Sequence, residues 1–197
     1  MKIYDISQEL FSSVVFPGDP APKKETLASM AEGDLYNLTA LSMCAHNGTH
    51  VDAPSHFVKD GKSVEEMELS KMVGPAYVKE HNGILTAEDA KTVLSEAEAV
   101  SREAAKRLLL KGKTTVSYEA AAVFAEYGID LIGNESQTVG PEDGPMAVHQ
   151  LLLGREIVLL EGVRLAHVPD GAYLLSAAPV CLGGVEGSPC RAILIEL

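Results

Sequence analysis

The sequence is poor in cysteine and has no cluster of basic residues. Its 197 residues include three cysteines, Cys44, Cys181 and Cys190, and no CxxC pair. An odd number of thiols does not suit a disulfide scaffold and predicts a reducing compartment, the cytoplasm. The net charge is −12 and the lysines and arginines are scattered. The sequence therefore predicts no binding to nucleic acid and none to a membrane surface, since both require a basic patch.

Long apolar runs are also missing. No segment approaches the roughly 20 apolar residues of a membrane span. The first residues, Met1 to Ile6, lack the apolar core of a signal peptide and include an aspartate. No repeat or low-complexity linker divides the chain. A chain of this length can bury about 70% of its unfolded surface, so we predict a single domain over residues 1–197.

What the sequence does contain is a regular alternation of strand and helix signals. Thr86 and Ser117 are typical helix N-caps, and glycines stand where the helices should end. Helices are expected from residue 87 onward and over residues 118–127 and 145–153. Strands are expected at residues 2–6, 38–43, 107–111, 129–132, 157–160, 173–180 and 192–195. Strands interleaved with short helices predict an α/β fold with a mixed β-sheet.

One glycine-rich segment requires a separate interpretation. Residues 183–187 read Gly-Gly-Val-Glu-Gly. They do not open a helix, as a phosphate-binding loop must. We therefore interpret the segment as a turn.

Metal-binding side chains are concentrated in one short segment. Residues 46–57, His-Asn-Gly-Thr-His-Val-Asp-Ala-Pro-Ser-His-Phe, hold three of the six histidines and one aspartate. Imidazole and carboxylate groups are the side chains that bind zinc or manganese. The alternative is an accidental cluster in a solvated loop. The glycine and proline favour the metal site, because they give each side chain a defined direction.

The spacing within this segment predicts a three-ligand set. His46 and His50 are four residues apart, but the turn pair Asn47-Gly48 opposes a helix, so we expect a turn that brings His46 beside a short strand. His50 and Asp52 are two apart and point to the same side of an extended strand. Three protein ligands with one open position are typical of a catalytic site. Cys44 offers a fourth ligand, although a buried small residue is the preferred interpretation.

Further candidates lie outside this set. His56 is interpreted as an acid–base imidazole, with a metal ligand as the alternative. Asp52 has two oxygens and can bridge to a second metal, for which His149 and Glu161 are the candidates. The alternative to metal binding is that His149 lies on the surface of a helix and Glu161 lies at the exposed end of a strand. The remaining histidines have no ligand spacing and are expected at the surface: His81 and His167.

Residues 46–57 resemble the H-x-G-[TA]-H-x-D-x-P-x-H motif of the metal-dependent cyclase/arylformamidase family, which is kynurenine formamidase-like. The resemblance covers nearly the whole chain. It extends to a WPGD-like loop at 16–19, a G-x-x-L-I-G-like strand at 127–133, His149 with the E-G-L-like element at 160–163, and the segments 169–173 and 187–192.

The resemblance implies a fold and a site. The implied fold is a swivelling β/β/α-type domain, in homodimers or homotetramers whose active sites lie near subunit contacts. The implied cofactor is one or two divalent ions, zinc or else manganese. The first ion would be bound by His46, His50 and Asp52, the second by Asp52, His149 and Glu161, and the catalytic imidazole would be His56.

Two segments depart from the family pattern. Where the family tends to read I-D-T-P-S-x-D, residues 134–140 read Asn-Glu-Ser-Gln-Thr-Val-Gly, with Glu135 in place of the aspartate. Residues 110–115 run almost directly into the helix that begins at Tyr118, whereas family members usually carry a longer, often Trp-containing loop. This chain has no tryptophan and 5% aromatic residues. The low aromatic content argues against an aromatic-lined pocket for a kynurenine-like ring.

These observations predict an enzyme that hydrolyses a small molecule. The expected reaction opens a small amide, a formamide, a cyclic imide or a lactone carbonyl through metal-activated water. His56 would donate a proton to the leaving atom. The competing hypothesis, motivated by the two departures, is a metal-binding protein that binds a small molecule without turnover. A third is an α/β domain with an incidental histidine cluster.

Overall fold

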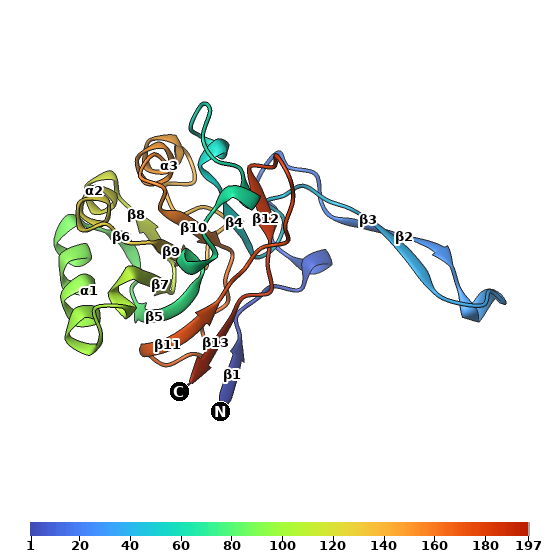
Figure 1. The fold of residues 1–197 in the computed structure, drawn as a ribbon, viewed down its shortest axis with the longest axis horizontal. Helices are drawn as coiled ribbons and strands as arrows, with labels where there is room; N and C mark the ends of the chain where they lie inside the picture. Colours follow the sequence, from blue (N-terminus) through green and yellow to red (C-terminus); the bar gives the residue numbers. More distant parts are fainter. Residues whose placement is uncertain (197) are drawn as a thin grey trace.

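The fold is built on one large, curled, mixed β-sheet (Figure 1). The computed structural model describes residues 1–196, and within them nine strands form the sheet in the order β1-β13-β11-β5-β7-β9-β10-β4-β12. Strands β5, β7, β9 and β10 run parallel in the centre, with antiparallel neighbours on both sides. The bounds are β1 Lys2–Asp5, β4 His50–Asp52, β5 Val73–Glu80, β7 Arg107–Lys111, β9 Leu131–Asn134, β10 Val158–Glu161, β11 Gly171–Ser176, β12 Gly187–Pro189 and β13 Ile193–Glu196.

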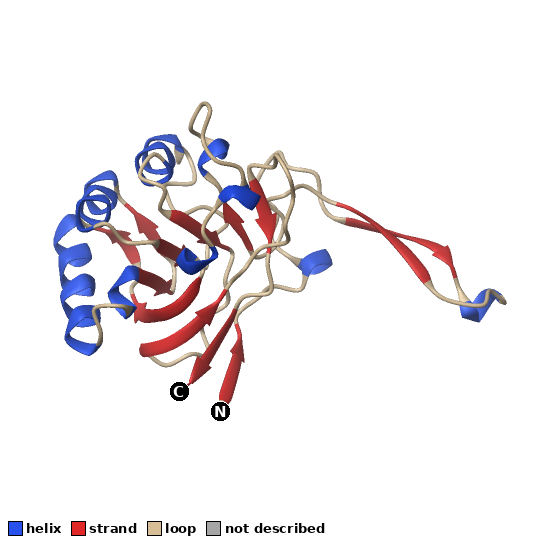
Figure 2. Cartoon of the chain, viewed as in Figure 1, coloured by secondary structure: helices blue, strands red, loops and turns tan. Residues whose placement is uncertain are grey.

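Within residues 1–196, three α-helices cover one face of the sheet (Figure 2). They are α1 (Ala87–Val100), α2 (Tyr118–Tyr127) and α3 (Met146–Leu153). Thr86 and Asp89 form a capping box at the start of α1, and the Ser117 hydroxyl accepts from the Ala120 N–H at 3.1 Å. Gly128 ends α2 with a φ of 76°, which favours glycine. Single 3₁₀ turns lie at Leu10–Ser12, Met30–Glu32, Pro54–His56, Val64–Glu66, Leu69–Lys71 and Ala104–Lys106.

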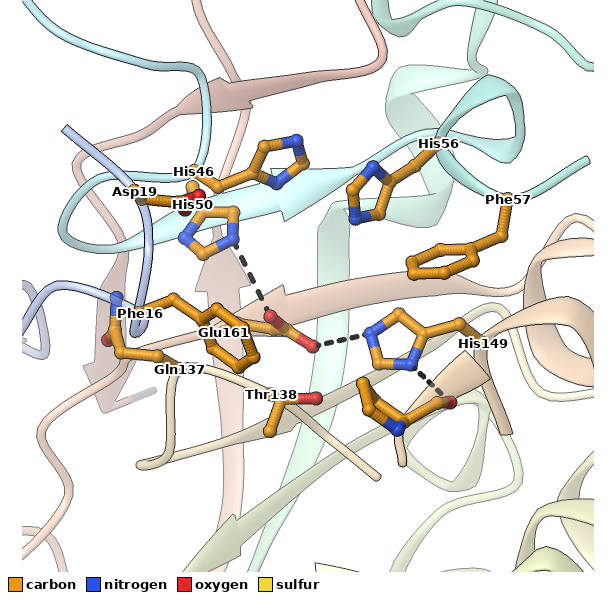
Figure 3. Close-up of a pocket in the computed structure, with 11 residues that line it drawn as sticks. Phe16, Asp19, His46, His50, His56, Phe57, Gln137, Thr138, His149 and Glu161 are labelled. Carbon is orange, nitrogen blue, oxygen red and sulfur yellow. Dashed lines mark hydrogen bonds and ion pairs between the residues drawn. The ribbon is translucent and has the colours of Figure 1, made fainter. Parts of the chain in front are cut away.

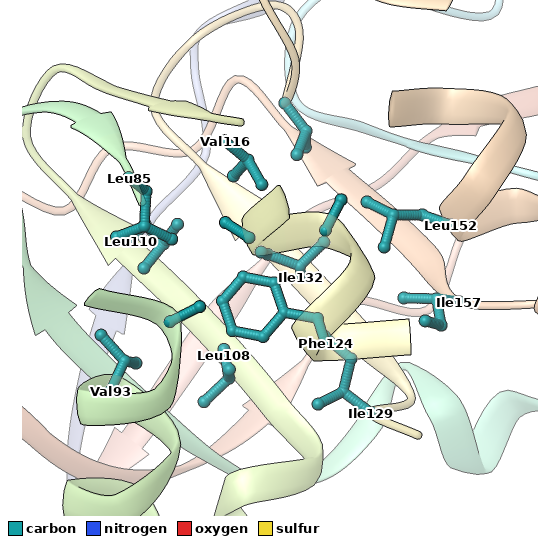
Figure 4. Packing of buried hydrophobic residues seen from close by; sticks show 14 of the residues in the cluster. Leu85, Val93, Leu108, Leu110, Val116, Phe124, Ile129, Ile132, Leu152 and Ile157 are labelled. Atoms are coloured by element: carbon teal, nitrogen blue, oxygen red, sulfur yellow. The ribbon is translucent and has the colours of Figure 1, made fainter. Parts of the chain in front are cut away.

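The central strands are buried on both faces, which explains their continuous apolar sequences. In β7, Leu108 and Leu110 belong to the core beneath the helices, and Leu109 belongs to the core on the other face. The fully buried ring of Phe124 from α2 lies in the first core, close to Leu108 and Ile132 (Figure 4). Val51 of β4 belongs to the second core, which fixes this strand in the sheet.

A two-stranded arm extends from the body of the molecule (Figures 1 and 2). Strands β2 (Lys23–Ala28) and β3 (Leu38–Ser42) pair only with each other among the described strands. Six large apolar side chains of the arm are exposed: Leu27, Met30, Leu35, Tyr36, Leu38 and Leu41. Two smaller strands, β6 (Gly83–Leu85) and β8 (Thr114–Val116), form another separate parallel pair.

The predicted elements are present, with shifted ends in several cases. The strand expected at 129–132 begins at Leu131, because the Ile129 N–H bonds to the Phe124 carbonyl and completes the end of α2. The strand expected at 173–180 ends at Ser176, and Pro179 makes only an isolated bridge to Cys190. The helix expected from Pro145 begins at Met146, with the proline at its cap.

Membrane insertion was not expected from the sequence. Across residues 1–196, none of the helices combines the length and the apolar character needed to cross a bilayer.

Candidate functional site

Strand β4 carries the centre of the site. It lies between β10 and β12 in the sheet, and His50 is paired with Glu161 of β10. His50 and Asp52 are two residues apart on an extended strand, so their side chains share a face. The pairing of two antiparallel strands therefore places a histidine and two carboxylates beside one another.

The first group of possible metal ligands is His46, His50 and Asp52. His46 comes from the turn before β4, where the Asn47 N–H bonds to the Cys44 carbonyl. The Asp52 Oδ1 atom lies 2.8 Å from His46 Nδ1 and 3.4 Å from His50 Nε2. These three atoms converge as the ligands of one divalent ion would.

The second group is Asp52, His149 and Glu161. Helix α3 contributes His149, whose Nε2 lies 3.2 Å from Glu161 Oε1 and 3.7 Å from Asp52 Oδ2. Glu161 Oε2 also lies 3.5 Å from His50 Nε2 (Figure 3). Asp52 belongs to both groups, so its two oxygens face two neighbouring positions.

The residues fit one or two divalent metal ions. Asp52 and Glu161 are only 1% and 3% exposed, and buried carboxylates require a compensating cation. The buried Oδ2 atom of Asp52 has no hydrogen-bond partner within residues 1–196. An imidazole-rich and carboxylate-rich donor set suits zinc, manganese or iron.

The outward-facing nitrogen of each candidate histidine ligand also has a partner. His50 Nδ1 lies 3.1 Å from the Gly48 carbonyl oxygen, and His149 Nδ1 lies 3.0 Å from that of Pro145. A hydrogen on Nδ1 donates to these carbonyls and leaves Nε2 free for a metal. For His46 the arrangement is reversed: Nδ1 faces Asp52, and Nε2 lies 3.3 Å from Glu186 Oε1.

The electrostatics of the cluster favour charged side chains without a metal. Burial opposes the charged form of His50, but its hydrogen bonds to the Asp52 and Glu161 carboxylates outweigh burial and raise its pKa to about 10. Burial also opposes ionisation of Asp52, yet hydrogen bonds from His46 and His50 hold its pKa well below the usual range. Burial likewise opposes charge on His149, whose pKa is raised by Glu161. Protons on the imidazoles therefore balance the buried carboxylates.

His56 differs from the other histidines of its segment. It ends the 3₁₀ turn Pro54–His56, and its ring stacks on that of His46, with centroids 4.2 Å apart. It belongs to neither ligand group among the described residues. Burial lowers its pKa, so the neutral imidazole predominates at pH 7. A neutral ring beside the ligands can accept or donate a proton.

A cavity of about 210 Å³ is lined by His56 and by four of the candidate ligands, His46, His50, His149 and Glu161 (Figure 3). Two phenylalanines, Phe16 and Phe57, also line it, so the chain's few aromatic residues include two in this pocket. The expectation of a pocket poor in aromatic rings is corrected in this respect. Four further residues that line the cavity were not predicted from the sequence to be functional: Asp19, Gln137, Thr138 and Pro145.

The side chain of Glu135 connects the two segments that depart from the family pattern, residues 110–115 and residues 134–140. Glu135 accepts the Gly112 N–H at 2.6 Å and the Leu165 N–H at 2.8 Å. It therefore holds the short turn between β7 and β8 against the sheet. A separate cavity of about 700 Å³ lies beside this turn and is lined in part by Lys113 and Ser136. The short turn leaves space there.

Some other candidates are placed differently from expectation. Cys44 is half-buried, its Sγ lies 3.9 Å from Asp19 Oδ2, and it belongs to neither ligand group within residues 1–196. Cys44 is therefore less buried than the expected buried small residue. His167 is exposed, whereas His81 is partly buried beside Asp89, because the end of β5 lies against the start of α1.

Comparison with known proteins agrees with the motif. The profile of the family described as "Putative cyclase" matches residues 4–141. Kynurenine formamidase of Bacillus anthracis is 35% identical over 98% of this chain and 97% of its own length. Kynurenine formamidase of Erythrobacter litoralis is 31% identical over 100% of this chain and 94% of its own length.

Solved structures share the fold. A potential metal-dependent hydrolase with cyclase activity superposes with a TM-score of 0.80 and 25% identity, covering 98% of this chain and 96% of that one. Isatin hydrolase A from Labrenzia aggregata has a TM-score of 0.80 at 23% identity, over 98% of this chain and 93% of its own. By its motif, its fold and its relatives, the chain belongs to the cyclase family.

Proposed function

We propose that this chain is a metal-dependent hydrolase of a small amide or formamide, in the manner of an arylformamidase. The observation that carries the proposal is the pair of ligand groups that share Asp52 and whose other members all line one cavity. The relatives from Bacillus anthracis and Erythrobacter litoralis are named kynurenine formamidase, which supports a small amide or formamide as the substrate. Cyclic imides and lactones have a similarly placed carbonyl and are included in the proposal.

Zinc is the proposed metal, with manganese as the second choice, in one or two ions. A bound divalent ion polarises a carbonyl and lowers the pKa of water. The chain's own groups complete the site. Phe16 and Phe57 provide apolar walls for a flat substrate. The neutral His56 can accept a proton from the attacking water and pass it to the leaving nitrogen.

The experiment is hydrolysis of a panel of formanilides, cyclic imides and lactones by zinc-loaded and by chelator-treated protein. We expect hydrolysis of at least one class with zinc and loss of this activity after chelation. Asp52→Asn should lose both bound zinc and activity, because Asp52 belongs to both ligand groups. Zinc binding without hydrolysis of any compound would instead favour the small-molecule-binding alternative.

We also propose that the protein acts as a homodimer or homotetramer in the cytoplasm. The exposed apolar side chains of the β2–β3 arm support the assembly, because such surfaces mark protein contacts. The base of the arm is next to the site: the Asn47 side chain donates to the Pro20 carbonyl at 3.2 Å. The three free cysteines support a reducing compartment.

A further inference from the structure

Residues 185–187, which lead into β12, lie next to the imidazole ring of His46. Glu186 Oε1 is 3.3 Å from His46 Nε2, on the opposite side of the ring from Asp52, which lies 2.8 Å from Nδ1. The Glu186 side chain is 45% exposed, whereas that of His46 is 15% exposed. The contact therefore lies at the solvent edge of the site.

Backbone contacts fix this turn to the strand that carries the ligands. The Glu186 carbonyl accepts the Ala53 N–H at 2.8 Å, directly after β4. Gly187 is paired with Asp52 in the sheet. A Cβ atom on Gly187 would lie only 2.7 Å from His46 Cε1, so the turn is in close contact with the imidazole. The backbone of Glu186 is therefore fixed beside β4 and next to the ring of His46.

His46 is the candidate ligand that needs such a partner. The rings of His50 and His149 donate from Nδ1 to backbone carbonyls and are almost completely buried. His46 is more exposed, and its Nε2 faces a carboxylate instead. A carboxylate accepts hydrogen bonds only, and both ring nitrogens of His46 face one, so without a metal the ring is held in its doubly protonated form. With a divalent ion held by Nδ1 and Asp52, the remaining hydrogen would lie on Nε2, and this is the tautomer in which Glu186 accepts a hydrogen bond.

We propose that Glu186 is a positioning residue that strengthens metal binding by holding His46 in this tautomer and orientation. The proposal rests on the proposed function only in requiring that the first ligand group binds a divalent ion. Carboxylates that contact a ligand histidine typically contribute 10–100-fold to metal affinity. Since Glu186 is half-exposed, we expect an effect of about 10-fold.

The test measures zinc dissociation constants by competition with a chromogenic chelator, without any substrate. Glu186→Ala should weaken zinc binding about 10-fold. Glu186→Gln should weaken it less, because the amide oxygen can still accept the Nε2 hydrogen. In zinc-loaded wild type, nitrogen NMR should show His46 protonated at Nε2, and this signal should exchange faster in Glu186→Ala.

Glu65→Ala is the matched control. Glu65 Oε1 accepts the Gly184 N–H at 2.7 Å, so this variant loosens the same loop without touching His46. Its zinc affinity should remain close to that of wild type. Equal losses in Glu65→Ala and Glu186→Ala, or no loss in Glu186→Ala, would overturn the proposal. Wild type that binds no zinc would instead refute the metal centre itself, together with the proposed function.

Discussion

At the scale of residues, three histidines within eleven positions have three different environments. His50 is completely buried between carboxylates, His46 contacts one carboxylate at each ring nitrogen, and His56 stacks on His46. The spacing of the motif predicted that these residues would lie together. It could not predict Glu186, which is 140 positions from His46 and belongs to a segment that we interpreted as a plain turn.

His56→Ala tests the assignment of the proton carrier. We expect turnover to fall about 10²–10⁴-fold, because a positioned acid–base group contributes that much to the rate. Bound zinc should stay at the wild-type level, since His56 belongs to neither ligand group within residues 1–196. Steady-state kinetics and elemental analysis of the same preparation provide the two measurements.

The exposed His167 offers a control for this prediction. His167→Ala should leave both turnover and zinc content unchanged. If His56→Ala loses its zinc, His56 is a ligand and the acid–base assignment is wrong.

At the scale of elements, local signals determined what could be predicted. The helices α1 and α2 begin at their predicted caps because Thr86 and Ser117 bond to the first-turn N–H groups. Strand ends were harder to predict, because an apolar residue such as Ile129 suits a strand and a helix end equally well. That β2 and β3 form an arm outside the main sheet could not be predicted from the local sequence pattern. The pattern indicates a strand but does not show with which other strands it pairs.

Thr86→Ala should destabilise the protein by about 1 kcal/mol, because the Asp89 N–H loses its capping oxygen. For a chain of this size, such a loss lowers Tm by about 2–4 °C. Calorimetry of the metal-free protein measures the change. Thr86→Ser retains the hydroxyl and should unfold within about 1 °C of wild type. An unchanged Tm in Thr86→Ala would show that the cap contributes nothing.

At the scale of the whole molecule, the described residues give the arm little support, because β2 and β3 pair only with each other and Lys24 at the base lies over the Phe11 ring. An isolated two-stranded hairpin is marginally stable in water. A second copy that covers Leu27, Leu38 and Leu41 would stabilise it and remove apolar surface from water. Conversely, the sheet and its two cores do not depend on the arm.

If the arm forms the proposed interface, replacement of residues 24–41 by a two-residue turn should convert the proposed oligomer into a folded monomer. Light scattering after size exclusion measures the mass, and circular dichroism measures the fold. Ile84→Asp is the control, because Ile84 is equally exposed but lies on the body, at 68% exposure. This variant should retain the wild-type mass. An oligomer that survives removal of the arm would contradict the assignment of the interface.

The pairing of β4 with β10 also affects the order in which the protein folds. His50 and Glu161 face each other across strands that are more than a hundred residues apart in the chain. Pairing at such sequence separation forms slowly, because a long loop must first be closed. A slip of one residue in this register would turn His50 and Asp52 to the opposite face. The second ligand group therefore forms only after β4 has paired with β10, and we expect a metal that binds to both groups to slow unfolding rather than to start folding.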